Sequence, residues 1–387
     1  MNILAIESSC DETAAAIVSG DPFSDIQPNL LANVVVSQID IFKEYGGVIP
    51  EVAARSHLEA ILPVIHRAFS EAKFIKNGQD DWSKIDAIAV THTPGLLGSL
   101  LIGTLTARTL AILHNKPLYA VHHLKSHIYA TWLEKENTPS FPLLALVVSG
   151  GHTQIIYMKK HNSFEIIGTT LDDAVGECFD KIAKILGLPY PGGPSIANAA
   201  KGILPNNQTS SNNVAEKAQT TSKNSSIRPG DPHKYRFPHP NAKSLDFSFS
   251  GLKTAVLRAV QQELGKPISF PSHDLAPLLT PQQKADFAAS FEETACDILL
   301  EKLKKALEEH PEVKSVVVAG GVSANEQLRW KSQKFSTENN VDVFFPVQKY
   351  SGDNAAMVGI AAFYEIKSKI APTDPYKLNI LPRSEIK

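Results

Sequence analysis

The sequence predicts an α/β protein that contains two copies of one structural unit. The first observation is a repeated pair of short apolar runs, each pair separated by a turn of small polar residues. The first pair is formed by residues 2–6 and 14–18, and the second by residues 143–148 and 154–158. Apolar runs of this length on both sides of a turn are typical of buried strands in a hairpin.

A second repeat follows each hairpin. The apolar run at 85–90 leads through a glycine-containing turn into a helical run at 99–113. The apolar run at 313–319 leads in the same way through Gly320 and Gly321 into another helical run. Two such series indicate a duplicated α/β unit, although strand–glycine–helix junctions also occur without duplication. Twin units would place their turns across a shared cleft, where backbone amides can hold phosphate.

The next elements follow from local signals. Apolar periodicity predicts a helix at 50–69, and a polar stretch predicts a loop at 77–83. Residues 172–186 have the pattern of an amphipathic helix that ends at Gly187. Pro-Gly-Gly-Pro at 191–194 predicts a rigid turn whose glycines let a ligand approach the backbone.

The second half contains one segment of different composition. Asn, Gln, Ser and Thr dominate residues 205–230, so little apolar surface is available to offset the ordering entropy, and we expect a disordered insertion. Thr280 is expected to cap a helix that runs through 286–307, with Pro281 at its first position. The last predicted elements are a strand at 341–345 and a helix at 355–367.

Length and composition limit the class of protein. A chain of 387 residues is long for one core, so two domains are expected. The net charge of -2 argues against nucleic-acid binding by overall charge alone. Three widely spaced cysteines, Cys10, Cys178 and Cys296, indicate a reducing compartment without disulfides. No basic leader with an apolar core and no apolar run near the ~18 residues of a membrane span is present, so we expect a cytoplasmic protein that does not bind membranes.

Two histidines form the most informative polar motif. If residues 121–127 are helical, His123 and His127 lie one turn apart on the same face. This spacing allows two imidazoles to bind one divalent cation, which then needs further ligands from elsewhere in the chain. The alternative is a polar helix face without a metal.

Several motifs together resemble one known family. They lie at 7–13, 123–127, 148–153, 176–181, 190–194, 247–253, 320–325 and 351–354. In this order they are similar to the bacterial-type tRNA N6-adenosine threonylcarbamoyltransferases of the TsaD/Kae1 family, formerly called O-sialoglycoprotein endopeptidases. The resemblance spans nearly the whole chain, and only the segment 205–230 is extra length.

The resemblance implies a fold and an activity. The fold is the actin-like (ASKHA, ribonuclease-H-like) duplicated two-domain α/β fold with an interdomain cleft. Its first domain would comprise residues 1–121 and 348–387, and its second domain residues 122–347. The reaction moves the threonylcarbamoyl group of threonylcarbamoyl-AMP to N6 of adenosine 37 in tRNAs that read codons beginning with A, and releases AMP. Expected partners are tRNA, an inactive paralogue subunit (TsaB-like) and a small ATPase (TsaE-like).

The resemblance also assigns site residues. One divalent metal ion per subunit would be held by His123, His127 and Asp353, a ligand set that suits Fe²⁺ first and Zn²⁺ second, with Mg²⁺ less comfortable. The residues expected to hold the nucleotide-like substrate are Val147, Val148, Ser149, Gly150, Gly151, Asp180, Gly193 and Asn325. Without the resemblance, Asp180 and Asn325 could equally be polar residues that start helices.

The chemistry of the donor defines what a site must supply. The donor is an activated mixed anhydride, so catalysis needs no protein nucleophile but must polarise the carbamoyl group, stabilise the leaving phosphate and align the amine. Asp11 and Glu12, on the first hairpin turn, are candidate bases for the proton of the amine. The alternative for Asp11 is a turn-closing role. His152 and Lys253 could stabilise negative charge or serve structure.

Three other functions fit these motifs less well. A zinc metalloprotease needs Glu directly after the first His, where this chain has Leu124. An actin-like kinase or ATPase usually has glycines in both phosphate turns, whereas residues 7–10 contain none. A non-catalytic nucleotide-dependent scaffold has no need of a metal site.

Overall fold

The computed structural model describes residues 1–24, 26–134, 136–205, 227–239 and 245–386. Within them, the strands form two five-stranded sheets of the same topology, in the orders β3-β2-β1-β6-β7 and β10-β9-β8-β11-β12. In each sheet the first two pairings are antiparallel and the last two are parallel. The duplicated α/β unit predicted from the sequence is therefore confirmed.

The strands of each sheet come from one continuous half of the chain. The first sheet contains β1 (Asn2–Glu7), β2 (Glu12–Ser19), β3 (Asn29–Ser37), β6 (Ala87–Thr93) and β7 (Leu118–His122). The second contains β8 (Leu143–Val148), β9 (Thr153–Met158), β10 (Glu165–Thr169), β11 (Ser315–Ala319) and β12 (Asp342–Phe344). Two-residue strands β4 (Ile75–Lys76) and β5 (Gln79–Asp80) form a separate small hairpin.

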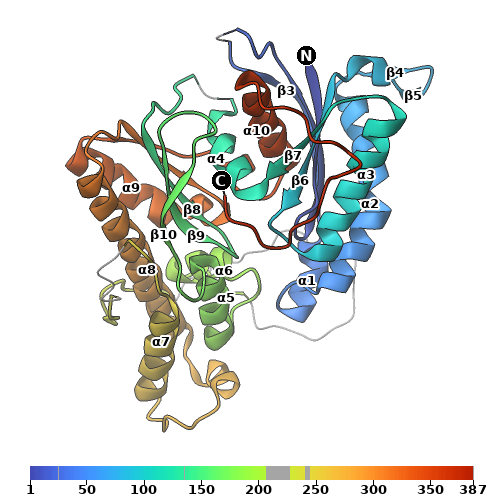
Figure 1. Ribbon diagram of the computed structural model, residues 1–387. Helices are drawn as coiled ribbons and strands as arrows, with labels where there is room; N and C mark the ends of the chain where they lie inside the picture. Colours follow the sequence, from blue (N-terminus) through green and yellow to red (C-terminus); the bar gives the residue numbers. More distant parts are fainter. Residues whose placement is uncertain (25, 135, 206–226, 240–244, 387) are drawn as a thin grey trace.

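Helices cover both faces of each sheet. They are α1 (Ile39–Tyr45), α2 (Pro50–Glu71), α3 (Leu97–Leu113), α4 (His123–Tyr129), α5 (Val175–Leu186), α6 (Gly192–Ala200), α7 (Ser250–Glu263), α8 (Pro281–Glu309), α9 (Glu326–Asn339) and α10 (Ala355–Lys367). Helices α2 and α3 pack on the outer face of the first sheet, and α5 to α9 lie on the outer side of the second. Helices α4 and α10 lie between the two sheets (Figure 1). None of the described helices is both long and apolar enough to cross a bilayer.

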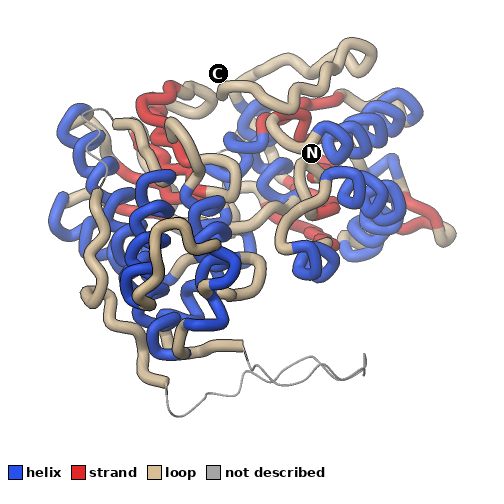
Figure 2. The backbone as a smooth tube through the Cα atoms, turned by 90° about the horizontal axis from the view of Figure 1, so that it is seen from below, coloured by secondary structure: helices blue, strands red, loops and turns tan. Residues whose placement is uncertain are grey.

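Three apolar clusters follow from this layering, because successive residues of a buried strand point to opposite faces. In β8, Leu144 and Leu146 belong to the outer cluster of the second unit, whereas Leu143 and Ala145 belong to the cluster between the sheets. The central cluster contains residues from both sheets and from α4 and α10. Seen from below, the strands fall into two groups (Figure 2), and this central layer joins them.

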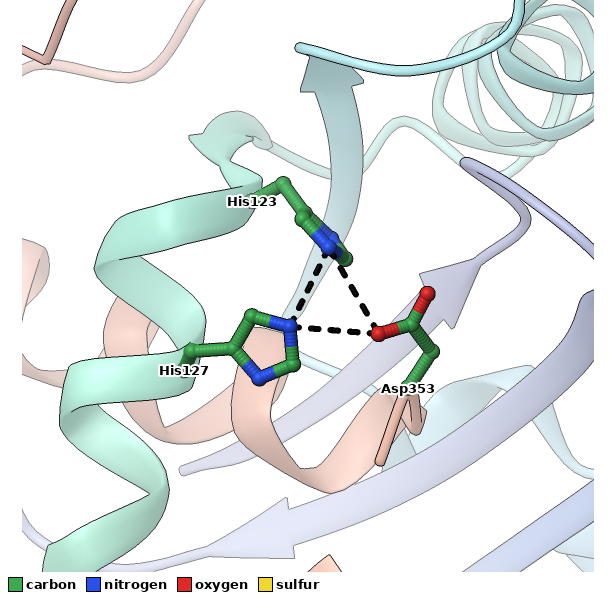
Figure 3. A group of neighbouring side chains, drawn as sticks. All are labelled: His123, His127 and Asp353. Atoms are coloured by element: carbon green, nitrogen blue, oxygen red, sulfur yellow. Dashed lines mark hydrogen bonds and ion pairs between the residues drawn. The ribbon is translucent and has the colours of Figure 1, made fainter. Parts of the chain in front are cut away.

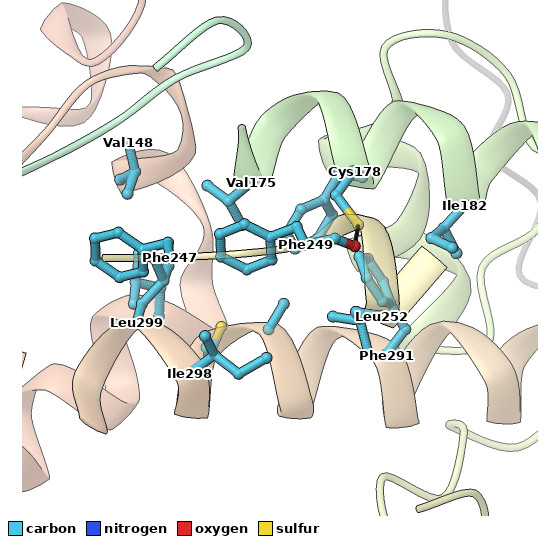
Figure 4. Close-up of a cluster of buried hydrophobic side chains, with 14 of the residues drawn as sticks. Val148, Val175, Cys178, Ile182, Phe247, Phe249, Leu252, Phe291, Ile298 and Leu299 are labelled. Atoms are coloured by element: carbon cyan, nitrogen blue, oxygen red, sulfur yellow. Dashed lines mark hydrogen bonds between the residues drawn. The ribbon is translucent and has the colours of Figure 1, made fainter. Parts of the chain in front are cut away.

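The outer cluster of the second unit explains one sequence motif. Phe247 and Phe249 are fully buried and lie between α5 and α8 (Figure 4). Cys178 of α5 also packs here, and its thiol donates to the Phe249 carbonyl at 3.7 Å. The aromatic residues of the motif 247–253 therefore serve the core.

The chain after α10 runs back over the first unit. Thr373 pairs with Leu118 at the edge of β7, and the carbonyl of Leu381 accepts a 2.6 Å hydrogen bond from the Thr93 hydroxyl. Further along, the Ser384 carbonyl lies 3.3 Å from Nε2 of His122, and Ile386 is buried in the central cluster. This C-terminal segment, residues 373–386, therefore ends beside the start of α4.

Two sequence predictions are corrected by the structure. Residues 191–194 do not form a rigid turn, because helix α6 begins at Gly192. Asp180 accepts a 2.6 Å hydrogen bond from the Gly192 amide, one of the helix-start donors that have no partner within the helix. The predicted loop 77–83 contains β5 and a 3₁₀ turn.

Other predicted elements hold with shifted ends. The helix predicted from 172 starts at Val175 and ends at Gly187 as predicted, and Gly187 has a left-handed backbone conformation. Helix α8 begins at Pro281 with a capping box between Thr280 and Gln283. The greater part of the predicted disordered insertion, residues 206–226, lies outside the described residues.

Candidate metal centre and substrate site

The two histidines and Asp353 come from equivalent places in the two units. Helix α4 follows β7, the last strand of the first sheet, and α10 follows β12, the last strand of the second, after one 3₁₀ turn. His122 caps α4 by accepting from the Leu124 amide at 3.3 Å, which makes His123 the first helical residue. Asn354 caps α10 by accepting from the Met357 amide at 3.1 Å, which fixes Asp353 just before the helix.

Three ligand atoms converge where these helices meet (Figure 3). Nε2 of His127 lies 3.2 Å from Nε2 of His123 and 3.1 Å from Oδ1 of Asp353. Nε2 of His123 lies 3.5 Å from the same carboxylate oxygen. A metal bound at ~2.0–2.2 Å from each of three ligands separates the ligand atoms by about 2.8–3.6 Å, from octahedral to tetrahedral angles, so the triangle fits a transition-metal ion.

The partners of His123 support the same fit. Its Nδ1 lies 3.4 Å from Oε2 of Glu7 and 3.2 Å from the Ser9 hydroxyl. A proton on Nδ1 facing a carboxylate leaves the lone pair of Nε2 directed at the triangle, as in the carboxylate–histidine pairs of metal sites. Glu7 is fully buried and also accepts from the Ser9 amide at 2.6 Å and the Thr91 hydroxyl at 2.5 Å.

The electrostatics of this cluster favour the binding of a cation. Burial disfavours the charged form of His123, but the carboxylates of Asp353 and Glu7 outweigh burial and raise its pKa to about 9. Burial raises the pKa of Asp353, but the charges of His123 and His127 outweigh burial and hold this pKa well below its usual range. The buried carboxylate of Glu7 and the partly exposed carboxylate of Asp353 face two imidazoles and therefore stabilise positive charge at this point, whether it is a proton or a metal.

Asp11 ends the first hairpin turn, and Glu12, predicted to lie on the turn, is the first residue of β2. Burial, together with the charges of Asp353 and Asp11, raises the pKa of Glu12 well above its ordinary value. Its Oε1 accepts a 3.1 Å hydrogen bond from the Ser37 hydroxyl. Burial raises the pKa of Asp180, the hydrogen bond from Gly192 opposes this, and the charge of Asp11 raises the pKa further. Asp11 is therefore close enough to α5 to interact electrostatically with Asp180.

The second unit supplies a turn of small residues opposite. Residues Val147 and Val148 end β8 and are fully buried, so their side chains serve the core while the following turn is open. A Cβ atom on Gly150, Gly151 or Gly193 would meet nothing within 4 Å. On Gly176 it would lie 2.6 Å from the Ser149 carbonyl oxygen, so the first turn of α5 presses directly against the open turn.

Two of the expected substrate residues are engaged within the protein. Asn325 caps α9 by accepting from the Leu328 amide at 2.9 Å, and its amide group donates to Glu292 at 2.6 Å. Asp180 uses Oδ1 to hold the Gly192 amide. The helix-start alternative considered for both residues therefore describes contacts that they make in the structure.

His152 lies near the histidine pair. Burial is the main cause that lowers its pKa to about 4, and the neighbouring charges of His123 and His127 act in the same direction. The ring is therefore neutral near pH 7 and can stabilise negative charge only as a hydrogen-bond donor.

Several residues important to this arrangement were not assigned a role from the sequence. Glu7 is one, and the signal that could have found it is a carboxylate at the end of an otherwise apolar strand. Asp172 is another: it accepts from the Phe249 amide at 2.7 Å and the Ser250 hydroxyl at 2.7 Å, which fixes the start of α7. Arg329 donates to the Ser323 carbonyl at 2.7 Å and the Ser351 hydroxyl at 3.3 Å, and so ties the turn after β11 to the one that carries Asp353.

The fold and the site define a class: an actin-like α/β protein with a candidate metal triad between its two units. Among solved structures, HypF from T. kodakarensis matches 95% of this chain and 48% of its own, with 13% identity and a TM-score of 0.55. Full-length HypF in the phosphate- and nucleotide-bound form matches with a TM-score of 0.52 at 13% identity. The chain thus spans about half the length of HypF, and at this identity the likeness concerns the fold.

Sequence comparison identifies the family. The family described as tRNA N6-adenosine threonylcarbamoyltransferase (TsaD) matches residues 29–360. A protein of that name from Symbiobacterium thermophilum is 44% identical over 363 residues, which cover 94% of this chain and 91% of the relative. Another, from Gloeothece citriformis, is 43% identical over 368 residues and covers 93% and 90%. The chain belongs to the tRNA N6-adenosine threonylcarbamoyltransferase family, as its motifs indicated.

Proposed function

We propose that this chain transfers the threonylcarbamoyl group of threonylcarbamoyl-AMP to N6 of adenosine 37 in tRNAs that read codons beginning with A, and that it does so with one divalent metal ion. Family membership supports the transfer and the tRNA substrate. The observation that carries the metal is the convergence of His123, His127 and Asp353, with ligand atoms 3.1–3.5 Å apart.

The ligand chemistry supports Fe²⁺ as the resident ion, with Zn²⁺ as the second choice. Two imidazole nitrogens and one carboxylate form the facial set found in non-haem Fe(II) sites. Three protein ligands leave open positions, and a bound ion would act there as a Lewis acid toward oxygens of the donor. Glu7 would fix the tautomer of His123 that binds the ion.

Protein groups supply the remaining chemistry. The open turn at Gly150 and Gly151, together with Gly193, would let the nucleotide approach the backbone. Asp11 and Glu12 are both candidates for the base that accepts the amine proton, since they are adjacent in sequence at the start of β2. The other carboxylate would then orient the base or share the proton.

The other assignments remain part of the proposal. Val147, Val148 and Ser149 would form the wall of the substrate site through their backbone, and Asp180 and Asn325 would contact substrate only with groups not used within the protein. The domain division at 121/122 and 347/348 is supported by sheets that each draw on one half of the chain. A TsaB-like paralogue, a TsaE-like ATPase and a cytoplasmic location are further proposals.

The test is a transfer assay with the full chain, supplied with both proposed partner proteins. Threonylcarbamoyl-AMP with a labelled threonine, tRNA with A37 and a control tRNA with G37 are the substrates, and AMP release and label transfer are measured with metal content. We expect transfer only to A37, and its loss by at least about 100-fold in His123→Ala and Asp353→Ala. His66→Ala, which removes an exposed histidine paired with Asp80, is the matched control and should retain activity. Full activity of a metal-free protein that carries both His123→Ala and Asp353→Ala would contradict the metal assignment.

A further inference from the structure

Another buried histidine lies close to the candidate bases. His57, on α2, has no exposed surface. Its Nε2 lies 2.9 Å from the Cys10 carbonyl oxygen, and its Nδ1 lies 2.8 Å from the Thr13 hydroxyl. Because a carbonyl can only accept, Nε2 must carry a proton and donate to Cys10.

The state of the ring follows from its surroundings. Burial lowers the pKa of His57, so the ring is neutral near pH 7 and Nδ1 is an acceptor. The Thr13 hydroxyl then donates to Nδ1, and both ring nitrogens are satisfied. The two contacts hold the chain on both sides of the candidate bases, because Cys10 directly precedes Asp11 and Thr13 directly follows Glu12.

Three successive carbonyls of this turn are held by separate elements. The Ser9 carbonyl accepts from the Leu96 amide at 2.8 Å, just before α3. The Cys10 carbonyl accepts a second bond from the Ser99 hydroxyl at 3.0 Å, and the Asp11 carbonyl accepts from the Gln38 amide at 3.1 Å. The peptide planes of the turn are therefore fixed by α2, by α3 and by the start of α1.

We propose that His57 is a positioning residue that sets the direction of the Asp11 and Glu12 carboxylates through the Cys10 carbonyl. The inference rests on the proposed function, in which one of these carboxylates accepts the amine proton. His57 touches no substrate, so its effect appears in the rate of the chemical step rather than in binding. A displacement of the base by about 1 Å can reduce a rate by about 100-fold.

Two amide substitutions separate this role from a packing role. In His57→Gln the side-chain nitrogen reaches the place of Nε2 and can still donate to Cys10, whereas in His57→Asn the amide reaches only the place of Nδ1. We expect His57→Gln to keep kcat within about threefold of the original. His57→Asn should lose kcat by about 10- to 100-fold, with KM for threonylcarbamoyl-AMP and metal content unchanged.

Two results would overturn the proposal. One is an equal loss of kcat in His57→Gln and His57→Asn, and the other is an unchanged kcat in a folded His57→Asn protein. If His57→Asn does not fold, Ser99→Ala replaces it, because it removes the other donor to the same carbonyl. A several-fold fall in kcat at constant KM in Ser99→Ala then supports the proposal, and an unchanged kcat refutes it. Failure of the unsubstituted protein to transfer the group would instead refute the proposed function.

Discussion

Glu7→Gln tests the assignment of the metal centre most directly, because Glu7 touches a proposed ligand without being one. The substitution keeps size and shape but replaces one carboxylate oxygen by an amide donor. In the structure, Oε1 accepts from the Ser9 amide, so the new donor would occupy the place of Oε2, which faces Nδ1 of His123 and the Thr91 hydroxyl. His123 would then be pushed toward the tautomer that carries its proton on Nε2, and Nε2 would then have no lone pair for the metal ion.

The size of the effect follows from the contacts. Loss of such an outer partner typically reduces metal affinity 10- to 100-fold. The Nδ1–Oε2 distance of 3.4 Å is long, and the Ser9 hydroxyl at 3.2 Å can still accept the proton. We therefore expect the lower end, about tenfold, or about 1.4 kcal/mol.

The assay is competitive metal titration of the purified protein with Fe²⁺ under anaerobic conditions and with Zn²⁺. Glu292→Gln is the matched control, since Glu292 is also a buried carboxylate but is paired with Asn325 away from the triad. An affinity equal to that of the unsubstituted protein, in a folded Glu7→Gln variant, would refute the tautomer argument.

Two further predictions concern the open turn and a buried carboxyl group. Gly176→Ala should displace the Ser149–Gly150 turn, because a Cβ would lie 2.6 Å from the Ser149 carbonyl oxygen. KM for threonylcarbamoyl-AMP should rise while metal affinity stays constant; Gly251→Ala, where a Cβ meets nothing within 4 Å, is the control. Burial raises the pKa of Glu365 to about 7, so the folded state holds a proton that the unfolded state has released, and stability falls as pH rises from about 4.5 to 7. Glu365→Gln should therefore raise the free energy of unfolding at pH 8 by on the order of 2–3 kcal/mol, measured as a higher Tm, and leave both unchanged at pH 4. An equal shift in Tm at both pH values would contradict the assignment.

Local patterns made two of the three proposed metal ligands visible in the sequence. His123 and His127 are four residues apart, so helical periodicity alone places their rings on one face. Asp353 is 226 residues beyond His127 and came only from the family resemblance, because no local pattern joins them. Their meeting depends on topology: each unit ends in a strand followed by a helix, and the two helices pack against each other.

The errors in the fold prediction have a tertiary origin. Pro-Gly-Gly-Pro favours a turn by local propensity, yet α6 begins there because Asp180 holds the Gly192 amide. The glycine is needed for another reason than turn formation, since a Cβ on Gly192 would lie 2.5 Å from the Cα of Asp180. Close packing of α5 against α6 thus outweighed the local preference of Pro-Gly-Gly-Pro for a turn.

The path of residues 373–386 makes the far end of the sequence a neighbour of the candidate metal centre. Its carbonyls hold Thr93 and approach His122, which directly precedes the first histidine of the triad. Ile386 is buried in the central cluster between the two sheets. Tags, truncations or natural variation in this tail would therefore be transmitted to the reaction centre, although none of its side chains belongs to it.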